Sequence, residues 1–267
     1  MRPSAPLALA ALAALACSAS PPPRPSLPPR PDDRGRVIAP CVPSPQAGGV
    51  AVRGHVFAFG PGGGGDGGRL GGAVVRSLEH PERCAVSAAD GAFSLGGFTP
   101  GEDVTLTMEH LGFAPIQTGT HAVPEAGIER LTFQAPVWEI FHVMAMTSLI
   151  RPRADRCQIA STVTERGVSI YDPPPSHGEA GATVTIEPHP EGMEGPVYFQ
   201  YIGPGTILPD PHLRETTRDG GVLFLNVPPG DYTLTARKDG VRVQQVRARC
   251  RAQWLVNASP PWGLQVL

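Results

Sequence analysis

Apolar and polar residues alternate in short runs along this chain, and glycine or proline stands between the runs. The run after Gly101 reads VTLTMEH, and the run after Gly230 reads DYTLTARK. Alternation with a period of two sends one set of side chains toward a core and the other toward solvent. Short strands of this kind, separated by turn residues, predict an all-β protein built as a sandwich or barrel.

One pattern occurs twice. The stretches 90–101 and 219–230 both begin with Asp-Gly and end with Pro-Gly, and apolar residues occupy the same three places between them. Asp-Gly suits a tight hairpin turn, and Pro-Gly suits the two central places of a type II turn. The repeat predicts two β-sandwich modules, which we place at residues 37–136 (module one) and 156–267 (module two).

The order of these signals resembles a known family. In module one, GAVV begins at Gly72 and DGAF at Asp90, and a Pro-Gly turn and a strand ending in Gly112 follow. This order resembles the carboxypeptidase regulatory-like domain, whose fold is a transthyretin-like Greek-key β-sandwich. The resemblance covers residues 49–135 and, less evenly, 156–259. It implies two Greek-key sandwiches and brings no catalytic residue that could be transferred to this chain.

The connecting segment 137–155 begins with the apolar stretch VWEIFHVMAMTSLI, residues 137–150. Some of its apolar residues recur at helical spacing and others alternate as in a strand, so the periodicity leaves both structures open. We favour a short helix packed against a module, followed by a linker. The stretch is too short to span a membrane.

The N-terminal residues predict export and a lipid anchor. Residues 1–16 combine an early arginine, an apolar run and small residues at its end, which is typical of a secretory signal peptide. The sequence ALAC that ends at Cys17 resembles the lipobox of bacterial lipoproteins, which implies acylation of Cys17 and attachment to a membrane. An ordinary cleaved signal with a chance cysteine is the alternative. Residues 17–36 are rich in proline and predict an extended tether. No Asp follows Cys17, which by the same resemblance implies the outer membrane of the cell envelope.

Four cysteines remain besides Cys17, namely Cys41, Cys84, Cys157 and Cys250. An even number in an exported chain favours disulfides, and four cysteines allow three pairings. Cys41–Cys84 and Cys157–Cys250 would each lie within one module, so we predict these two bonds. No two cysteines have the C-x₂₋₄-C spacing of a zinc site.

Motifs for catalysis are missing from the sequence. There is no H-E-x-x-H zinc motif and no complete G-x-S-x-G elbow, so we expect no enzyme and no cofactor. Three His-x-Glu pairs, at His80, His177 and His189, leave a surface metal site open, although solvated loops explain them equally simply. A metal-dependent enzyme on a related sandwich, similar to the intradiol dioxygenases, is the rival hypothesis. Those enzymes bind iron through two Tyr and two His, and no such pattern is recognisable here.

The best candidate for binding is the long insertion Pro188–Glu215 in module two, because long loops in compact domains often carry function. It contains the aromatic residues Tyr198, Phe199 and Tyr201. The alternative is that residues 197–202 form a core strand with some of the aromatic side chains inward. The net charge of −2 and the lack of a basic run argue against nucleic acid. We therefore expect an envelope protein or a polysaccharide as the partner, or a structural role without a specific ligand.

Overall fold

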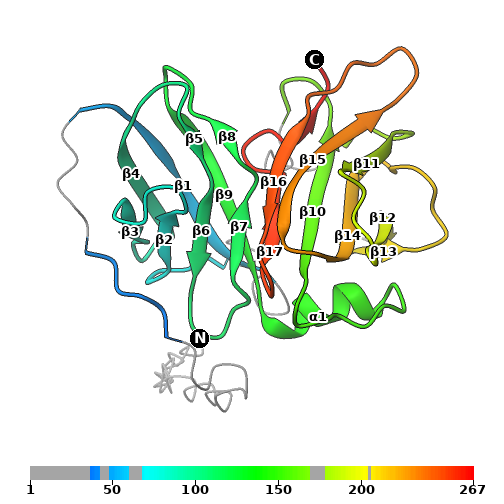
Figure 1. The fold of residues 1–267 in the computed structure, drawn as a ribbon, viewed down its shortest axis with the longest axis horizontal. Coiled ribbons are helices and arrows are strands. Elements are labelled where there is room, and N and C mark those ends of the chain that lie inside the picture. Colours follow the sequence, from blue (N-terminus) through cyan, green and yellow to red (C-terminus); the bar gives the residue numbers. More distant parts are fainter. Residues whose placement is uncertain (1–36, 43–47, 60–67, 169–177, 204–205) are drawn as a thin grey trace, which may run out of the picture.

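The computed structural model describes residues 37–42, 48–59, 68–168, 178–203 and 206–267 (Figure 1). The signal peptide, Cys17 and the proline-rich tether lie outside the described residues. Strands form nearly all of the regular structure in the described part, and two hydrophobic clusters fill two sandwiches. The predicted all-β sandwich fold is confirmed. None of the helices in this part is long and apolar enough to cross a membrane.

Module one packs two sheets over a core that includes Phe98, Leu131 and Phe133. One sheet has the order β4-β1-β9, with β1 (Val50–Phe59), β4 (Ala92–Phe98) and β9 (Ile128–Pro136). The facing strands are β2 (Val74–Ser77), β3 (Cys84–Val86), β6 (Leu106–Glu109) and β7 (Ile116–Thr118). The short strands β5 (Asp103–Val104) and β8 (His121–Ala122) pair with each other.

Module two repeats the same pairings over its own core. Its strands are β10 (Cys157–Thr164), β11 (Thr183–Glu187), β14 (Gly221–Val227), β15 (Gly230–Arg237), β16 (Val246–Cys250) and β17 (Leu255–Asn257). β10 pairs antiparallel with β14 and parallel with β17, as β1 does with β4 and β9. The pairs β11–β15 and β15–β16 match β2–β6 and β6–β7. The sequence repeat is therefore a repeat of topology.

The two modules share one sheet. β17 of module two pairs in parallel with β7 of module one, so that Leu255 lies beside Ile116 and Asn257 beside Thr118. The result is a ten-stranded sheet whose main path runs β13-β12-β14-β10-β17-β7-β6-β2-β3, with β12 (Glu194–Gly203), β13 (Thr206–Asp210) and, beside β10, β18 (Leu264–Gln265). In Figure 1, β7 and β17 lie side by side where the left and right halves meet.

Side chains from both modules reinforce this join. Gln117 donates a hydrogen bond from Nε2 to the carbonyl of Arg249 at 2.6 Å. The Arg247 guanidinium binds the Asp103 carboxylate, with Nη1 2.7 Å from Oδ2. Leu255 of module two packs into the core of module one. Backbone, ionic and apolar contacts thus all hold the modules together.

The connecting segment contains the helix α1 (Trp138–Met146), which lies beneath the junction in Figure 1. Trp138 and Phe141 are buried in the core of module one. Ala145 packs instead against Val197 and Leu223 of module two. Because its buried face contacts both modules, the helix is part of the junction and not a free linker.

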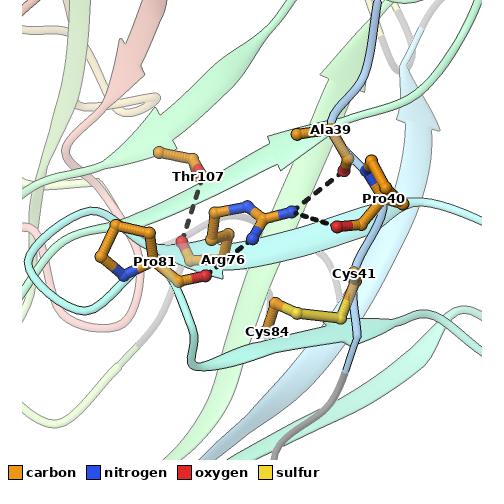
Figure 2. The surroundings of a disulfide bond; sticks show 7 residues. All are labelled: Ala39, Pro40, Cys41, Arg76, Pro81, Cys84 and Thr107. Carbon is orange, nitrogen blue, oxygen red and sulfur yellow. Dashed lines mark hydrogen bonds between the residues drawn. A yellow bond between two sulfur atoms is a disulfide. The ribbon is translucent and has the colours of Figure 1, made fainter.

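Both predicted disulfides are present. Cys157–Cys250 links β10 to β16, and Cys41–Cys84 fastens the segment before β1 to the edge strand β3 (Figure 2). Arg76 holds the same segment, because its Nη2 donates hydrogen bonds to the carbonyls of Ala39 at 3.0 Å and Pro40 at 3.2 Å. Residues 39–41, held by Arg76 and Cys84, are called the strap below.

Candidate binding cleft

The insertion in module two folds as a β-hairpin at the edge of the ten-stranded sheet. Its strands are β12 (Glu194–Gly203) and β13 (Thr206–Asp210), and β12 pairs with β14. The alternative of a core strand at residues 197–202 with some aromatic side chains inward is therefore confirmed, and only the remainder of the insertion forms loops. β13 has a free edge in the described part, and Pro209 on it lacks the N–H that another strand would need.

Successive residues of β12 point to opposite faces of the sheet, which separates the predicted aromatic contacts. Tyr198 points into the core of module two and is only 2% exposed. Its hydroxyl accepts a hydrogen bond from the backbone N–H of Val184 at 3.0 Å, and burial raises the pKa of this phenol. The prediction of Tyr198 as a surface contact was wrong, because its side chain completes the core.

Phe199 and Tyr201 lie on the other face, where they line a cleft of about 280 Å³ between the modules. The apolar lining comes from the hairpin, from the ends of β1 and β9, from α1 and from β17. It includes Phe59, Met144, Phe199, Tyr201, Ile207 and Leu255. Tyr201 is 48% exposed and Phe59 is 41% exposed, so both present aromatic surface to an incoming partner.

Few polar groups lie in the wall of the cleft. The buried hydroxyl of Ser161 has no hydrogen-bond partner among the described residues. The hydroxyls of Thr162 and Ser259 bind each other at 3.0 Å. The Asp219 carboxylate accepts a hydrogen bond from the Gly221 N–H at 3.1 Å, and burial raises the pKa of this carboxyl.

The Asp-Gly turn shapes this part of the cleft. Gly220 has a φ of +73°, which favours glycine, but the turn leads from β13 to β14, which do not pair, so it is not the hairpin turn that the sequence predicts. A Cβ on Gly221 would stand 2.4 Å from the Asp219 carboxylate and 2.9 Å from the Phe199 ring. Glycine at 221 therefore lets the carboxylate and the aromatic ring approach the strand closely.

The structure gives little support to a metal site in the described residues. No group of three or more His, Cys, Asp and Glu side chains there is arranged to hold a metal ion. His80 instead lies 2.7 Å from Glu102, which also binds Arg83. The hydroxyl of Tyr232 donates to the carbonyl of Pro228, so this phenol, like that of Tyr198, is engaged with the backbone. His177 and Tyr171 lie outside the described residues.

Sequence reasoning found Phe199 and Tyr201 but missed the rest of the cleft. Phe59, Ser161 and Leu255 come from three strands that are far apart in the chain. Their local patterns are those of ordinary strands, and only the docking of the modules brings them together. The Asp-Gly turn at 219 was visible as a turn, but nothing local linked it to a cleft.

Comparison with known proteins adds no close relative. No family model and no curated protein matches the sequence. Among solved structures, the Bacillus anthracis TIE protein is 13% identical, with a TM-score of 0.24, over 78% of this chain and 33% of that chain. The chain thus spans a third of the length of that protein. GBS52, a minor pilin of Streptococcus agalactiae, is 9% identical, with a TM-score of 0.25, over 81% of this chain and 95% of that chain. TM-scores this low assign neither a family nor a function.

Proposed function

We propose that this chain is a non-catalytic lipoprotein of the cell envelope whose docked modules bind a protein partner through the cleft. Lipid on Cys17 anchors it to the outer membrane, and residues 17–36 form the tether. Three features support this location in the cell envelope: the lipobox resemblance, the proline-rich stretch and the two disulfides, which are typical of exported proteins. Carboxypeptidase regulatory-like modules, suggested by the sequence, suit such a role.

The observation that carries the proposal is the meeting of Phe59, Phe199 and Tyr201 at an apolar cleft that both modules build. Aromatic residues are enriched at protein interfaces, and the strongest contacts are those that fill a desolvated pocket. Most of the accessible wall is apolar, which favours a protein side chain over a polysaccharide, whose many hydroxyls each need a polar partner.

The cleft is tested with the full chain as bait in envelope extract, followed by affinity measurement with the captured protein. We expect Tyr201→Ala and Phe59→Ala each to weaken binding at least about tenfold, or about 1.4 kcal/mol. Leu111→Ala is the matched control, because Leu111 is 59% exposed in a loop of module one away from the cleft. Equal affinity in all three variants would remove the cleft from the proposal. Capture of nothing by the parent chain would favour a structural role.

The anchor is tested separately by cell fractionation. Cys17→Ser should release the chain from the membrane fraction, because acylation requires the thiol. If the variant stays in the membrane fraction as the parent does, the lipid anchor is refuted while the cleft is unaffected.

A further inference from the structure

A second, larger cavity opens at the end of the junction where α1 lies, and it shares no lining residue with the binding cleft. Its volume is about 680 Å³, within the range of small-molecule sites. α1 forms one wall, the segment before β10 another, and the ends of β6, β14 and β17 complete it. Both modules contribute, so the cavity exists only because they are docked.

A hydrogen-bond acceptor without a partner belongs to a residue in the wall of this cavity. Gln158 on β10 is 3% exposed, and its Nε2 donates to the backbone carbonyl of Phe141 at 3.3 Å. A carbonyl can only accept, so the amide nitrogen must face Phe141, and Oε1 is the atom left over. This oxygen has no hydrogen-bond partner among the described residues. A buried acceptor without a donor costs about 1–3 kcal/mol, which a ligand hydroxyl or amide N–H could offset.

The charged groups around the cavity already face opposite charges. Arg153 donates to Asp155 at 3.0 and 3.2 Å, and the Nε of Arg156 is 3.3 Å from the same carboxylate. Burial lowers the pKa of Arg251 to about 10, while the nearby Glu109 raises it. Arg153 and Arg156 share one carboxylate, and the Nε of Arg156 and one Nη of Arg251 have no hydrogen-bond partner among the described residues, so donors as well as an acceptor are left over here.

Aromatic residues also contribute to the wall. Trp138 and Phe141 from α1 are only 8% and 5% exposed, and Trp254 lies just before β17. The Arg251 guanidinium lies 3.6 Å from the centre of the Trp254 ring. Aromatic rings pack well against the C–H faces of sugar rings, while amide and guanidinium groups exchange hydrogen bonds with sugar hydroxyls. We propose that this cavity binds one or two rings of a neutral saccharide, with a hydroxyl or amide N–H donating to Gln158 Oε1.

The test uses the full chain and two probes, cellobiose and N,N′-diacetylchitobiose, followed by tryptophan fluorescence. Two of the three tryptophans line the cavity, so binding should change the emission saturably. Gln158→Met removes the acceptor at similar volume and should weaken binding about fivefold, the worth of one neutral hydrogen bond. Gln245→Met is the matched control, because the side chain of Gln245 bonds Thr235 on the surface of module two.

Melting temperatures verify that each variant is folded. If Gln158→Met does not fold, Trp254→Ala takes its place and should weaken binding at least as much. No saturable change with either disaccharide up to the millimolar range overturns the proposal. Equal affinities of the parent and the cavity variants for the disaccharides also overturn the proposal. Saturable binding of a proline-rich peptide copying residues 20–31, with none of either sugar, would assign the cavity to the tether instead. Each result is independent of the protein-binding cleft.

Discussion

His121 is a buried histidine at the contact between the two modules. It lies on β8 of module one, is 6% exposed and makes an edge-on contact with Trp262 of module two at 5.9 Å between ring centres. Burial lowers its pKa to about 4; a hydrogen bond with the backbone of Pro260 acts in the opposite direction, and Arg247 adds to the lowering. The imidazole is therefore neutral in the folded chain at pH values where a free histidine is charged.

This difference predicts a loss of stability in mild acid. Below the free value of about 6.5, the unfolded chain takes up a proton at His121 while the folded chain does not, so unfolding becomes easier as the pH falls toward 4. The difference between the free pKa of 6.5 and the folded pKa of about 4 corresponds to about 3 kcal/mol in the free energy of unfolding. Urea unfolding of the parent and His121→Phe between pH 7 and 4 measures it, and the variant should lose about 3 kcal/mol less. If the free energies of unfolding of the parent and the variant fell equally with pH, His121 would be accessible to protons in the folded chain.

The aromatic residues of β12 show what sequence can say about single positions. Alternation predicts that Phe199 and Tyr201 share one face and that Tyr198 lies on the other, but it cannot say which face is the core. That choice depends on the pairing of β12 with β14, where the register shifts between Glu194 and Val197. Because a slip of one residue exchanges the faces, the inward place of Tyr198 could not be read from the chain alone.

At the scale of elements, Asn226 fixes the path of the chain after α1. It is the last residue but one of β14 and has a φ of +52°. Its Nδ2 donates to the carbonyl of Arg151 at 3.0 Å, and its Oδ1 accepts from the N–H of Arg153 at 2.8 Å. Asparagine tolerates this backbone conformation better than most residues, and its amide supplies both bonds. One side chain thus ties the connecting segment to module two.

Substitution separates the two contributions. Asn226→Ala loses both hydrogen bonds and strains the backbone, so we expect a loss of about 3 kcal/mol in the free energy of unfolding. Asn226→Gly loses the bonds but accepts the positive φ, so its loss should be about 2 kcal/mol. Equal losses in the two variants, measured by urea unfolding, would show that backbone strain plays no part.

Strands and turns were predictable from the sequence where a few neighbouring residues determine them. Positive φ at Gly91, Gly220 and Gly101 fits the two Asp-Gly turns and the first Pro-Gly turn, because turn chemistry acts over a few residues. At Pro229-Gly230 the expected type II turn is absent, since Gly230 has no positive φ and begins β15. Helix and strand stayed open for residues 137–150, since both periodicities are present. The helix is favoured in the structure because Trp138, Phe141 and Ala145 can then reach two cores at once.

At the scale of the whole molecule, the shared sheet predicts that the modules unfold together. β17 belongs to the sheet of module two, yet it pairs with β7 and buries Leu255 in the core of module one. Calorimetry should show one transition whose calorimetric and van't Hoff enthalpies agree. Two resolved transitions would mean that the join is weak enough for each sandwich to melt alone.

This join could not be predicted from the sequence. The residues that meet there, such as Gln117 and Arg249, are 132 positions apart, and each has an ordinary role in its own strand. The repeat predicted two separate modules, because the same turn residues and alternating runs occur in each and indicate that each can form a sandwich. Whether two sandwiches also share an edge depends on edge strands, whose pairing leaves no local signature. Both the cleft and the larger cavity follow from that docking, so neither could be foreseen as a whole.

The strap at Cys41 determines how a pull on the tether would enter the fold (Figure 2). Tension arriving from the N-terminal side reaches Cys41 and crosses the sulfur–sulfur bond to Cys84 on β3. The chain between these cysteines, which includes β1 and β2, is bypassed and bears no load. With the bond reduced, the same pull would peel β1 from its neighbours and free a loop of 43 residues, about 150 Å of extended chain. If the N-terminal segment is anchored as proposed, the disulfide transmits a pull from that side directly to β3 and not through the N-terminal end of β1.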